Sequence, residues 1–448
     1  MRTRRTARAT LPILALALGA CSDTTGPGGN LTQMLLDFCS DDIPTFFAVQ
    51  NGSAWERVDP DGQGTVSFQA AEEFGIAIVR QQGASFTSRF IFAAASELQT
   101  MNGVACTERS GIKDLQGAVS GVSSQQFGLV SMARRAAELA PTQTVYSLTN
   151  LPTGPLDLVA HRETAAFAPD RVIVRRALNF TSGATITPAL DFDGGDSQAS
   201  VANTLTIGGF VPSEENWILV DFRTATGTVH PFQTVSGFTS SAQTIYGFPA
   251  GLTQAGDLHD VEMFAYDALD NYRGVRQFNR NAGDLTFALG PALNTPTIFS
   301  QEPAPYVQFR AQVQSQGEYG AFVSTYYIQG QDEGERIVEV IATATYIGGT
   351  PSVWDITIPN LSAVTGFPTQ AMLQEGIATT WYVDAFGGGA LATFLGSPAD
   401  GTAYRYAGNS SAVLSSRLSR SGGTPTRPMR PSSLQRPPPT RTPLRGGI

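Results

Sequence analysis

The sequence lacks the paired cysteines and histidines from which many recognisable sites are built. It has three cysteines but no Cys-x-x-Cys, so neither a redox motif nor a structural zinc site is supported. It has three histidines but no His-Glu-x-x-His. No two of them stand at metal-ligand spacing, so we expect His161, His230 and His259 to be loop or surface residues. A Gly-x-Ser-x-Gly motif is also missing, which leaves an α/β-hydrolase nucleophile unsupported.

Lysine is almost absent, because Lys113 is the only one in the chain. With Ser110 it forms a Ser-x-x-Lys, the spacing used by penicillin-binding proteins and serine β-lactamases. Those enzymes also need a Lys-Thr-Gly element, which requires a second lysine. The motif is therefore incomplete.

Basic residues are scarce in the body of the chain. With the four arginines near the start and the seven after Ser416 set aside, 18 basic residues face 38 acidic ones. Nucleic-acid binding needs clustered positive charge. The sequence therefore predicts no nucleic-acid partner.

The first residues have the charged-then-apolar order of an export signal. Four arginines precede the apolar residues 11–20, which are too few for the roughly 20 that a bilayer-spanning helix needs. The run closes with Leu18-Gly19-Ala20-Cys21, which resembles the lipobox of bacterial lipoproteins. The resemblance implies that residues 1–20 are a signal peptide, and that Cys21 becomes the acylated (palmitate-type) first residue of the mature chain. An ordinary secretory signal with an incidental cysteine is the alternative.

That resemblance also predicts the location of the protein. We expect a cell-envelope protein held at a lipid bilayer through Cys21, with residues 21–30 as a flexible stalk without apolar side chains to bury. Ser22 stands where an acidic residue is associated with inner-membrane retention, which favours the outer membrane over the inner one. The body then faces the periplasm or the outside.

Two thiols remain, Cys39 and Cys106. In an oxidising compartment they predict one disulfide, closing a loop of about 67 residues and worth about 4 kcal/mol on the chain-entropy estimate. Two buried free thiols are the alternative.

Short apolar or alternating runs separated by Gly, Asn, Asp and Pro predict strands almost everywhere. The fold class expected is all-β, with several antiparallel β-sandwich modules in tandem. Helices are expected only near 94–101 and, as an alternative to a strand and loop, at 128–140. The segment "IGGTPSVWDI" predicts a turn between paired strands. The expected modules are residues 31–110, 111–206, 207–300 and 301–416.

Residues 144–163, "TVYSLTNLPTGPLDLVAHRE", carry a second resemblance. A strand that enters Leu-Pro-Thr-Gly-Pro and leaves through Leu-Asp-Leu-Val-Ala resembles the Pro-x-Gly hairpin of carboxypeptidase-regulatory-like modules, here over residues 144–210. Pro152 fixes φ and Gly154 tolerates the positive φ of a tight turn. The resemblance implies a β-sandwich and transfers no active site.

The composition changes after Ser416. Residues 417–448 contain seven arginines, seven prolines and no acidic residue, so they cannot form a core and are expected to be disordered. Either a basic tail contacts anionic envelope groups, or the reading frame runs through a sequence error.

Acidic loops are the candidates for Ca²⁺. Asp59 and Asp61 begin an EF-hand-like "DPDGQG" whose twelfth position is Ala70 instead of glutamate. A second acidic turn holds Asp191, Asp193 and Asp196. The alternative is that Asp and Gly serve only as turn residues. Other acidic loop positions, to which no glycosidase geometry is assigned, are Glu214, Glu215, Asp267 and Asp270.

These features favour an envelope lipoprotein with a non-catalytic binding, adhesive or structural role, whose partner is a glycan or an envelope protein. Sandwich modules offer loops for ligand contact, and exposed tryptophans there would stack on sugars. The four tryptophans are Trp55, Trp217, Trp354 and Trp381, for each of which a core position is the alternative. The alternative functions are a carbohydrate-active hydrolase using an acidic pair and a periplasmic partner in envelope assembly.

Overall fold

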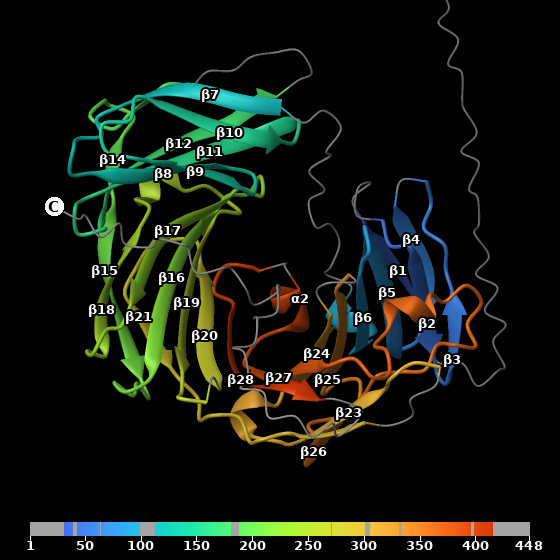
Figure 1. Ribbon diagram of the computed structural model, residues 1–448. Helices are drawn as coiled ribbons and strands as arrows, with labels where there is room; N and C mark the ends of the chain where they lie inside the picture. Colours follow the sequence, from blue (N-terminus) through green and yellow to red (C-terminus); the bar gives the residue numbers. More distant parts are fainter. Residues whose placement is uncertain are drawn as a thin grey trace, which may run out of the picture.

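The computed structural model describes residues 31–38, 43–62, 64–98, 113–180, 188–269, 271–300, 305–330, 334–395 and 398–414. This part of the chain is built from β-strands, with two one-turn α-helices, α1 (Ala95–Leu98) and α2 (Leu391–Phe394) (Figure 1). The all-β, multi-module class expected from the sequence is confirmed, as is the brief helix near residue 95. Within the described residues, no helix has the length and apolar character needed to cross a membrane.

The first sandwich packs a five-stranded sheet, in the order β14-β12-β11-β8-β9, on a three-stranded one, β10-β7-β13. Alternate side chains of β7 are buried, which places Leu115 and Val119 in the core with Tyr146, Leu158 and Ile173. The strands are β7 (Lys113–Ser120), β8 (Phe127–Met132), β9 (Arg135–Leu139), β10 (Val145–Leu151), β11 (Gly154–Glu163), β12 (Pro169–Phe180), β13 (Leu190–Asp191) and β14 (Gln198–Ala199).

The second sandwich packs the sheet β18-β15-β21 on β17, β16, β19 and β20. Its core includes Phe222, Phe232 and Phe248, whose rings stack or tilt against one another. The strands are β15 (Val201–Gly208), β16 (Glu215–Arg223), β17 (Val229–Ser236), β18 (Ala242–Gly247), β19 (Leu258–Tyr266), β20 (Tyr272–Asn279) and β21 (Leu285–Ala288). The 3-10 turns of the described chain are η1 (Ala250–Leu252), η2 (Gly317–Tyr319) and η3 (Thr369–Ala371).

The remaining strands come from both ends of the described chain. The N-terminal ones are β1 (Thr32–Asp37), β2 (Phe46–Asn51), β3 (Ala54–Arg57), β4 (Thr65–Ala70), β5 (Glu73–Gln82) and β6 (Ser85–Ala94). The C-terminal ones are β22 (Thr297–Ser300), β23 (Phe309–Gln314), β24 (Phe322–Gln329), β25 (Arg336–Thr343), β26 (Val353–Thr357), β27 (Thr379–Gly387) and β28 (Ala403–Leu414).

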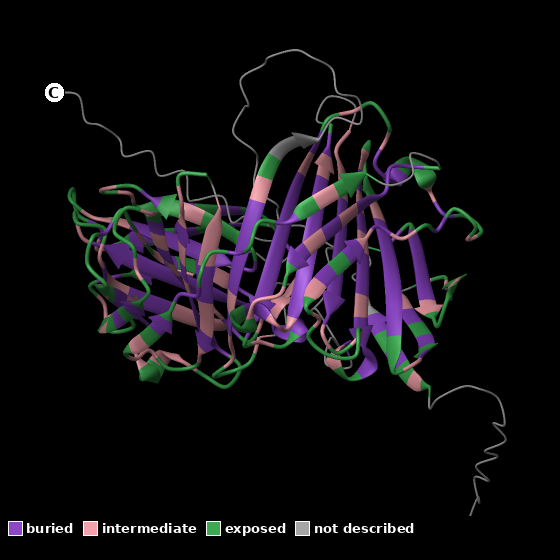
Figure 2. Cartoon of the chain, turned by 90° about the horizontal axis from the view of Figure 1, so that it is seen from below, coloured by how far each residue is buried: buried purple, intermediate pink, exposed green. Residues whose placement is uncertain are grey.

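One twelve-stranded sheet joins the second sandwich to both ends of the chain. Its order is β17-β16-β19-β20-β28-β27-β24-β25-β6-β5-β2-β3, and β25 pairs with β6 in parallel. The sheet bends into a U, with α2 in the opening between its arms (Figure 1). Figure 2 shows that many strands of the molecule are buried over much of their length.

The two faces of this sheet carry separate cores. The outer face packs on the sheet β22-β23-β26 around Trp354 and Tyr327. The inner face packs on α1, α2 and the β1–β4 pair around Phe322 and Phe386. Four strands from each of the segments 31–110 and 301–416 therefore share one sheet: β2, β3, β5 and β6 from the first, and β24, β25, β27 and β28 from the second. The expected boundary after residue 206 falls inside β15, and the one after residue 300 directly follows β22.

Three local expectations are corrected. Strands β10 and β11 belong to different sheets, so the Pro152 turn crosses between sheets and makes no hairpin, although Gly154 does take a positive φ of 128°. Residues 128–140 form the antiparallel pair β8–β9, because Ala133 takes φ 52° and ends any helical run. Strands β25 and β26 flank the turn in "IGGTPSVWDI" without pairing with each other.

Two tyrosine–glycine pairs hold β20 against β28. Tyr272 lies opposite Gly408, and Tyr406 lies opposite Gly274. A Cβ atom on Gly408 would stand 2.4 Å from Cζ of Tyr272, and one on Gly274 would stand 2.4 Å from Cζ of Tyr406. Each tyrosine ring thus covers the glycine on the neighbouring strand. Only a residue without a side chain permits this close approach.

We predict that Gly408→Ala destabilises the protein by about 1–3 kcal/mol, because the added methyl group would displace the Tyr272 ring from its packed position. Gly195→Ala is the matched control, since Gly195 is exposed and has no atom within 4 Å of its Cβ position. Urea unfolding of both variants measures the difference. Equal midpoints for Gly408→Ala and the wild type would contradict the close packing described.

Candidate functional site

The inner face of the twelve-stranded sheet carries a belt of polar and aromatic side chains across its second-sandwich arm and base. On β19 the alternate residues Val261, Met263 and Ala265 point into the second sandwich, so the residues between them face the inner side. Cross-strand register places the other members of the belt on the same face. The belt residues are Trp217, Arg223, Asp260, Glu262, Phe264, Tyr266, Tyr272, Arg276, Tyr382, Asp384, Tyr404 and Tyr406.

Asp260 is the centre of a buried ion cluster. Its Oδ2 accepts from Arg223 Nε and from Arg276 Nη2, and its Oδ1 accepts from Arg276 Nε, each at 2.7 Å. The side chain of Asp260 is only 1% exposed. Burial opposes its charged form, but Arg276 and Arg223 outweigh burial and lower the pKa of Asp260. This carboxylate is ionised and fully occupied.

Two tyrosine–carboxyl contacts continue the belt. The Tyr406 hydroxyl donates to Glu262 Oε1 at 2.6 Å, and the Tyr272 hydroxyl donates to Asp384 Oδ1. Burial raises the pKa of Asp384 to about 7, and the nearby Glu339 adds to this. Burial and then Glu262 raise the pKa of Tyr406 well above its ordinary value. The side chain of Asp384 is inaccessible to solvent, so it cannot contact a ligand directly.

The open part of the belt is aromatic. Trp217 lies opposite Phe264, and Tyr266 lies opposite Tyr272 across neighbouring strands, and all four side chains are partly exposed. Ring centroids are 5.6 Å apart for Phe264–Tyr266 and 5.7 Å apart for Tyr266–Tyr272. The indole N–H of Trp217 donates to Glu215 Oε1 at 3.3 Å. These four residues are called the aromatic platform below.

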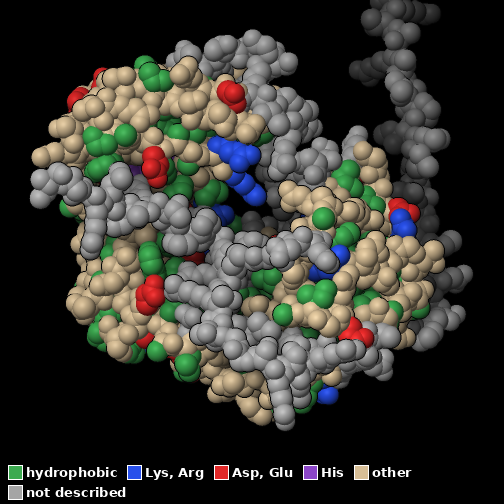
Figure 3. All heavy atoms as spheres, viewed as in Figure 1, with side chains coloured by type: hydrophobic (Ala, Val, Ile, Leu, Met, Phe, Trp, Pro, Cys, Tyr) green, Lys and Arg blue, Asp and Glu red, His purple; other side chains and the backbone are tan. Residues whose placement is uncertain are grey.

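Figure 3 shows a hollow between the arms of the molecule, with Lys or Arg side chains gathered on its upper edge. Arg134 lies in the β8–β9 turn and Arg135 begins β9. Both follow Ala133, whose carbonyl oxygen accepts from Val229 N on β17 at 2.9 Å. Val229 is the cross-strand partner of Arg223 in the belt. The two exposed arginines therefore stand close to the upper end of the belt.

Of the belt residues, only Trp217 was singled out from the sequence, although β19 carries a signal for the site. Four successive alternate positions of β19, at Asp260, Glu262, Phe264 and Tyr266, are polar or aromatic, while the positions between them are apolar. That pattern indicates a strand with one face outside the sandwich core. The partners on β27 and β28, including Asp384, carry no comparable signal and were missed.

The Ca²⁺ candidates are spread over two turns far apart in the fold. Asp59 pairs with Arg57 at 2.7 Å, and Asp61 Oδ1 accepts from Thr65 N at 2.8 Å, as a turn residue does. In the second turn, Asp193 pairs with Arg162 at 2.9 Å and Asp196 with Arg175 at 2.7 Å. The remaining carboxylate, that of Asp191, accepts from Asp193 N at 3.1 Å. Among the described residues, no group of three or more His, Cys, Asp or Glu side chains is arranged to hold a metal ion.

The other candidates fall in several places. Glu214 pairs with Arg273 at 2.8 Å, and Asp267 accepts three hydrogen bonds within its own turn. Trp354 and Trp381 are core residues, and Trp55 packs on Phe90 and Phe92. Only Trp217 joins the belt. The predicted residues that lie outside the described part are Cys21, Cys39, Cys106, Ser110, Asp270 and residues 417–448.

The prediction that the histidines are loop or surface residues is wrong. His161, His230 and His259 lie on β11, β17 and β19, and each is at most 3% exposed. The fold buries them because each lies at a strand position that faces the second sandwich, His161 from the outer side of the first sandwich's larger sheet. His161 and His230 meet, with Nδ1 and Nε2 2.7 Å apart.

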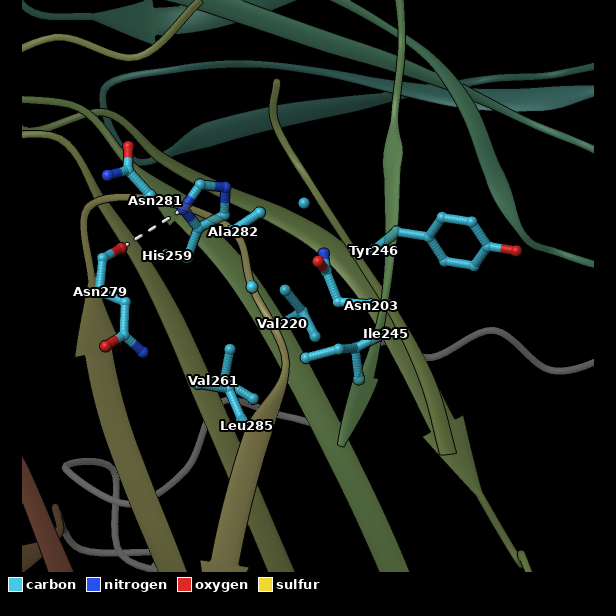
Figure 4. A pocket seen from close by; sticks show the side chains of 12 residues that line it. Asn203, Val220, Ile245, Tyr246, His259, Val261, Asn279, Asn281, Ala282 and Leu285 are labelled. Atoms are coloured by element: carbon cyan, nitrogen blue, oxygen red, sulfur yellow. Dashed lines mark hydrogen bonds between the residues drawn. The ribbon is translucent and has the colours of Figure 1, made fainter. Parts of the chain in front are cut away.

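His259 borders a small pocket at one end of the second sandwich (Figure 4). Its Nε2 accepts from Phe248 N at 2.8 Å, and its Nδ1 stands 3.1 Å from the carbonyl oxygen of Arg280. The free volume is about 10 Å³, room for a single water molecule. Both ring nitrogens are occupied and a sugar does not fit, so we assign this pocket a structural role.

Comparison with known proteins gives no family. No family model matches the chain, and no curated protein matches it. Nine chains of solved structures match, among them the Bacillus anthracis TIE protein, with a TM-score of 0.14 and 8% identity. That alignment covers 78% of this chain, which spans 62% of the length of the other. A similarity at this level carries no argument about function.

We predict that Asp260→Asn destabilises the chain by about 3 kcal/mol, because it leaves two largely buried arginines without their shared carboxylate. The low pKa of Asp260 also implies stability that is present above about pH 4 and is lost as pH falls below it. Acid unfolding of the variant should therefore show less pH dependence in that range. Asp355→Asn, which breaks the exposed pair Arg310–Asp355, is the control and should change little. Equal effects of the two substitutions would contradict the burial argument.

Proposed function

We propose that this chain is a lipid-anchored protein of the cell envelope whose aromatic platform binds a glycan. The observation that carries the proposal is the platform itself: partly exposed rings on one sheet face beside ionised and hydrogen-bonding groups. Sugar rings present apolar C–H faces to an aromatic ring, while their hydroxyls bond to carboxylates, tyrosine hydroxyls and guanidinium groups. Trp217 and the exposed Glu215 place both kinds of contact side by side, because the indole N–H of Trp217 donates to Glu215 Oε1.

The size of the platform favours a glycan over a protein partner. An aromatic side chain carries about 150–250 Å² of surface, and these four are mostly buried, so together they expose on the order of 200 Å². A stable protein interface needs roughly 800 Å² from each partner. A few sugar units fit a surface of the smaller size.

The carboxylates favour binding over hydrolysis. A glycosidase needs two carboxyl groups that reach the sugar. Asp260 is held by two arginines, Glu262 accepts from Tyr406, and Asp384 has no exposed surface. The hydrolase is therefore the second candidate, and the appearance of cleaved products on incubation with a bound glycan would establish it.

The membrane anchor is supported by the sequence of residues 1–21, where an apolar run ends on Leu18-Gly19-Ala20-Cys21. Acyl chains contribute about 0.8 kcal/mol per buried CH₂, so several of them hold a protein at a bilayer surface. An outer-membrane location remains our expectation on the ground of Ser22, and the Cys39–Cys106 disulfide likewise stays a prediction.

We predict that mass spectrometry of the mature N-terminus finds Cys21 as the first residue, with acyl chains attached. A Cys21→Ser variant should lose the acyl mass and move from the membrane fraction to the soluble one. An unmodified peptide that extends upstream of residue 21 in the wild type would defeat the assignment.

For the platform, we predict that the acylated chain in detergent binds at least one member of a glycan array built from envelope polysaccharides and peptidoglycan fragments. Trp217→Ala or Tyr266→Ala should weaken binding of that glycan about tenfold, because a lost ring stack is worth roughly 1.4 kcal/mol. Calorimetric titration measures the dissociation constants.

Phe299→Ala is the matched control, since Phe299 is 41% exposed on β22, away from the platform. It should bind as the wild type does. The proposal fails if no array member binds, or if the platform variants and the control bind equally. Capture of an envelope protein without any glycan would favour the assembly role instead.

A further inference from the structure

The two sandwiches meet at a buried junction. The outer side of the first sandwich's larger sheet, carrying Val159 and Val172, packs into the core of the second sandwich. On one flank, Arg176 bridges Asp157 at 2.9 Å and Asp257 at 2.5 Å. A side-chain hydrogen bond adds to the contact, since Thr228 Oγ1 donates to the backbone carbonyl oxygen of Asp157 at 2.7 Å.

On the other flank lies a chain of three titratable side chains. Glu163 Oε1 and His161 Nε2 are 2.9 Å apart, both on β11. His161 Nδ1 and His230 Nε2 are 2.7 Å apart and join the first sandwich to the second. His161 is 1% exposed and His230 is 0% exposed. Among the described residues, His230 Nδ1 is buried and has no hydrogen-bond partner.

The number of protons on the two rings decides which hydrogen bonds the Glu163–His161–His230 series can form. The two neutral rings carry two N–H protons. His161 Nε2–H donates to Glu163, which as a carboxylate only accepts, and His230 Nε2–H donates to His161 Nδ1. His230 Nδ1 is then a bare lone pair. A third proton can bind to either ring. In both cases one proton lies between the two rings and one faces Glu163, so the remaining N–H is at His230 Nδ1. That N–H has no acceptor among the described residues of the closed junction.

We infer that the His161–His230 pair is an acid-sensitive lock between the two sandwiches, closed when the pair is neutral and loosened when it takes up a proton. A buried cationic ring with an unpaired N–H costs far more than the same ring in water. Opening the junction supplies that water. Protonation therefore favours the separated arrangement of β11 and β17.

Among the residues that the structure describes around the pair, Glu163 supplies the one compensating charge in direct contact. From the first sandwich, Val172 and Val174 on β12 and Ser131 on β8 share the face of His161, with Arg176 and Asp157 further along it. From the second sandwich the rings of Phe232 and Phe248 flank His230. Behind Phe248 lies His259, close to Asp257. Arg176 already engages both aspartates.

The direction of the pH effect follows from the same groups. Burial, and then the neighbouring His161, lower the pKa of His230 well below its ordinary value. An opened junction restores a pKa near 6.5. Below about pH 6.5 the open form therefore binds a proton that the closed form does not. The ratio of closed to open molecules then falls by up to tenfold for each unit by which the pH drops.

Hydrogen exchange on the mature chain at pH 7.5 and pH 5.0, corrected for intrinsic rates, tests the lock. Protection of the amides of β8, β11 and β17 should fall at least tenfold at pH 5.0, while β2 and β5 keep theirs. Equal protection of the junction at both pH values in the wild type overturns the proposal without any variant.

His230→Gln should abolish the pH effect at the junction. Its amide donates to neutral His161 or accepts from protonated His161, so the extra proton always finds a partner. His259→Gln is the control, because His259 also titrates inside the second sandwich and is not part of the lock. It should leave the pH dependence of junction exchange intact. A pH effect that survives in His230→Gln or disappears in His259→Gln overturns the assignment to this pair.

Discussion

The parallel pairing of β6 with β25 is the contact on which the rest of the architecture depends. It aligns Phe86–Phe92 with Arg336–Ala342, so residues about 250 positions apart in the chain share one hydrogen-bond ladder. Without this pairing, β6 would be an edge strand with one unpaired side, and the N-terminal strands would lose their connection to the large sheet. Both cores of that sheet mix residues from the two ends of the chain, so neither end buries its apolar surface alone.

The continuity of the large sheet is also what places the belt. Arg89 on β6 meets Glu339 on β25, and Tyr272 on β20 meets Asp384 on β27, all on one side of the sheet. Strands from the second sandwich and from the C-terminal segment must therefore lie in fixed register before the site exists. The tyrosine–glycine pairs at the β20–β28 boundary fix that register, because a slip by one residue would bring a side chain under each ring.

Period-two patterns identified the strands, and turn residues identified where they end. Which strands pair with one another could not be predicted from the sequence. Nothing in "TVYSLTNLPTGPLDLVAHRE" shows that β10 and β11 enter different sheets, since a hairpin and a sheet-to-sheet crossing need the same turn chemistry at Gly154. The prediction that the histidines lie in loops or on the surface was wrong for a related reason. His161 and His230 lie in segments that alternate imperfectly, and their burial depends on the contact between two sandwiches that no local pattern encodes.

The belt combines buried charged groups with partly exposed aromatic rings. This combination supports the proposal that the surface binds a ligand. Replacing a buried ion cluster by apolar residues of similar volume is often neutral or stabilising, so Asp260 with its two arginines is no requirement of folding. The cluster does hold Arg276 and Glu262 beside the platform in one geometry, because Arg276 donates to both oxygens of Asp260 and Glu262 accepts from Tyr406. A ligand that reads hydroxyl positions needs such a fixed polar frame, whereas a purely apolar inner face would serve the sheet equally well.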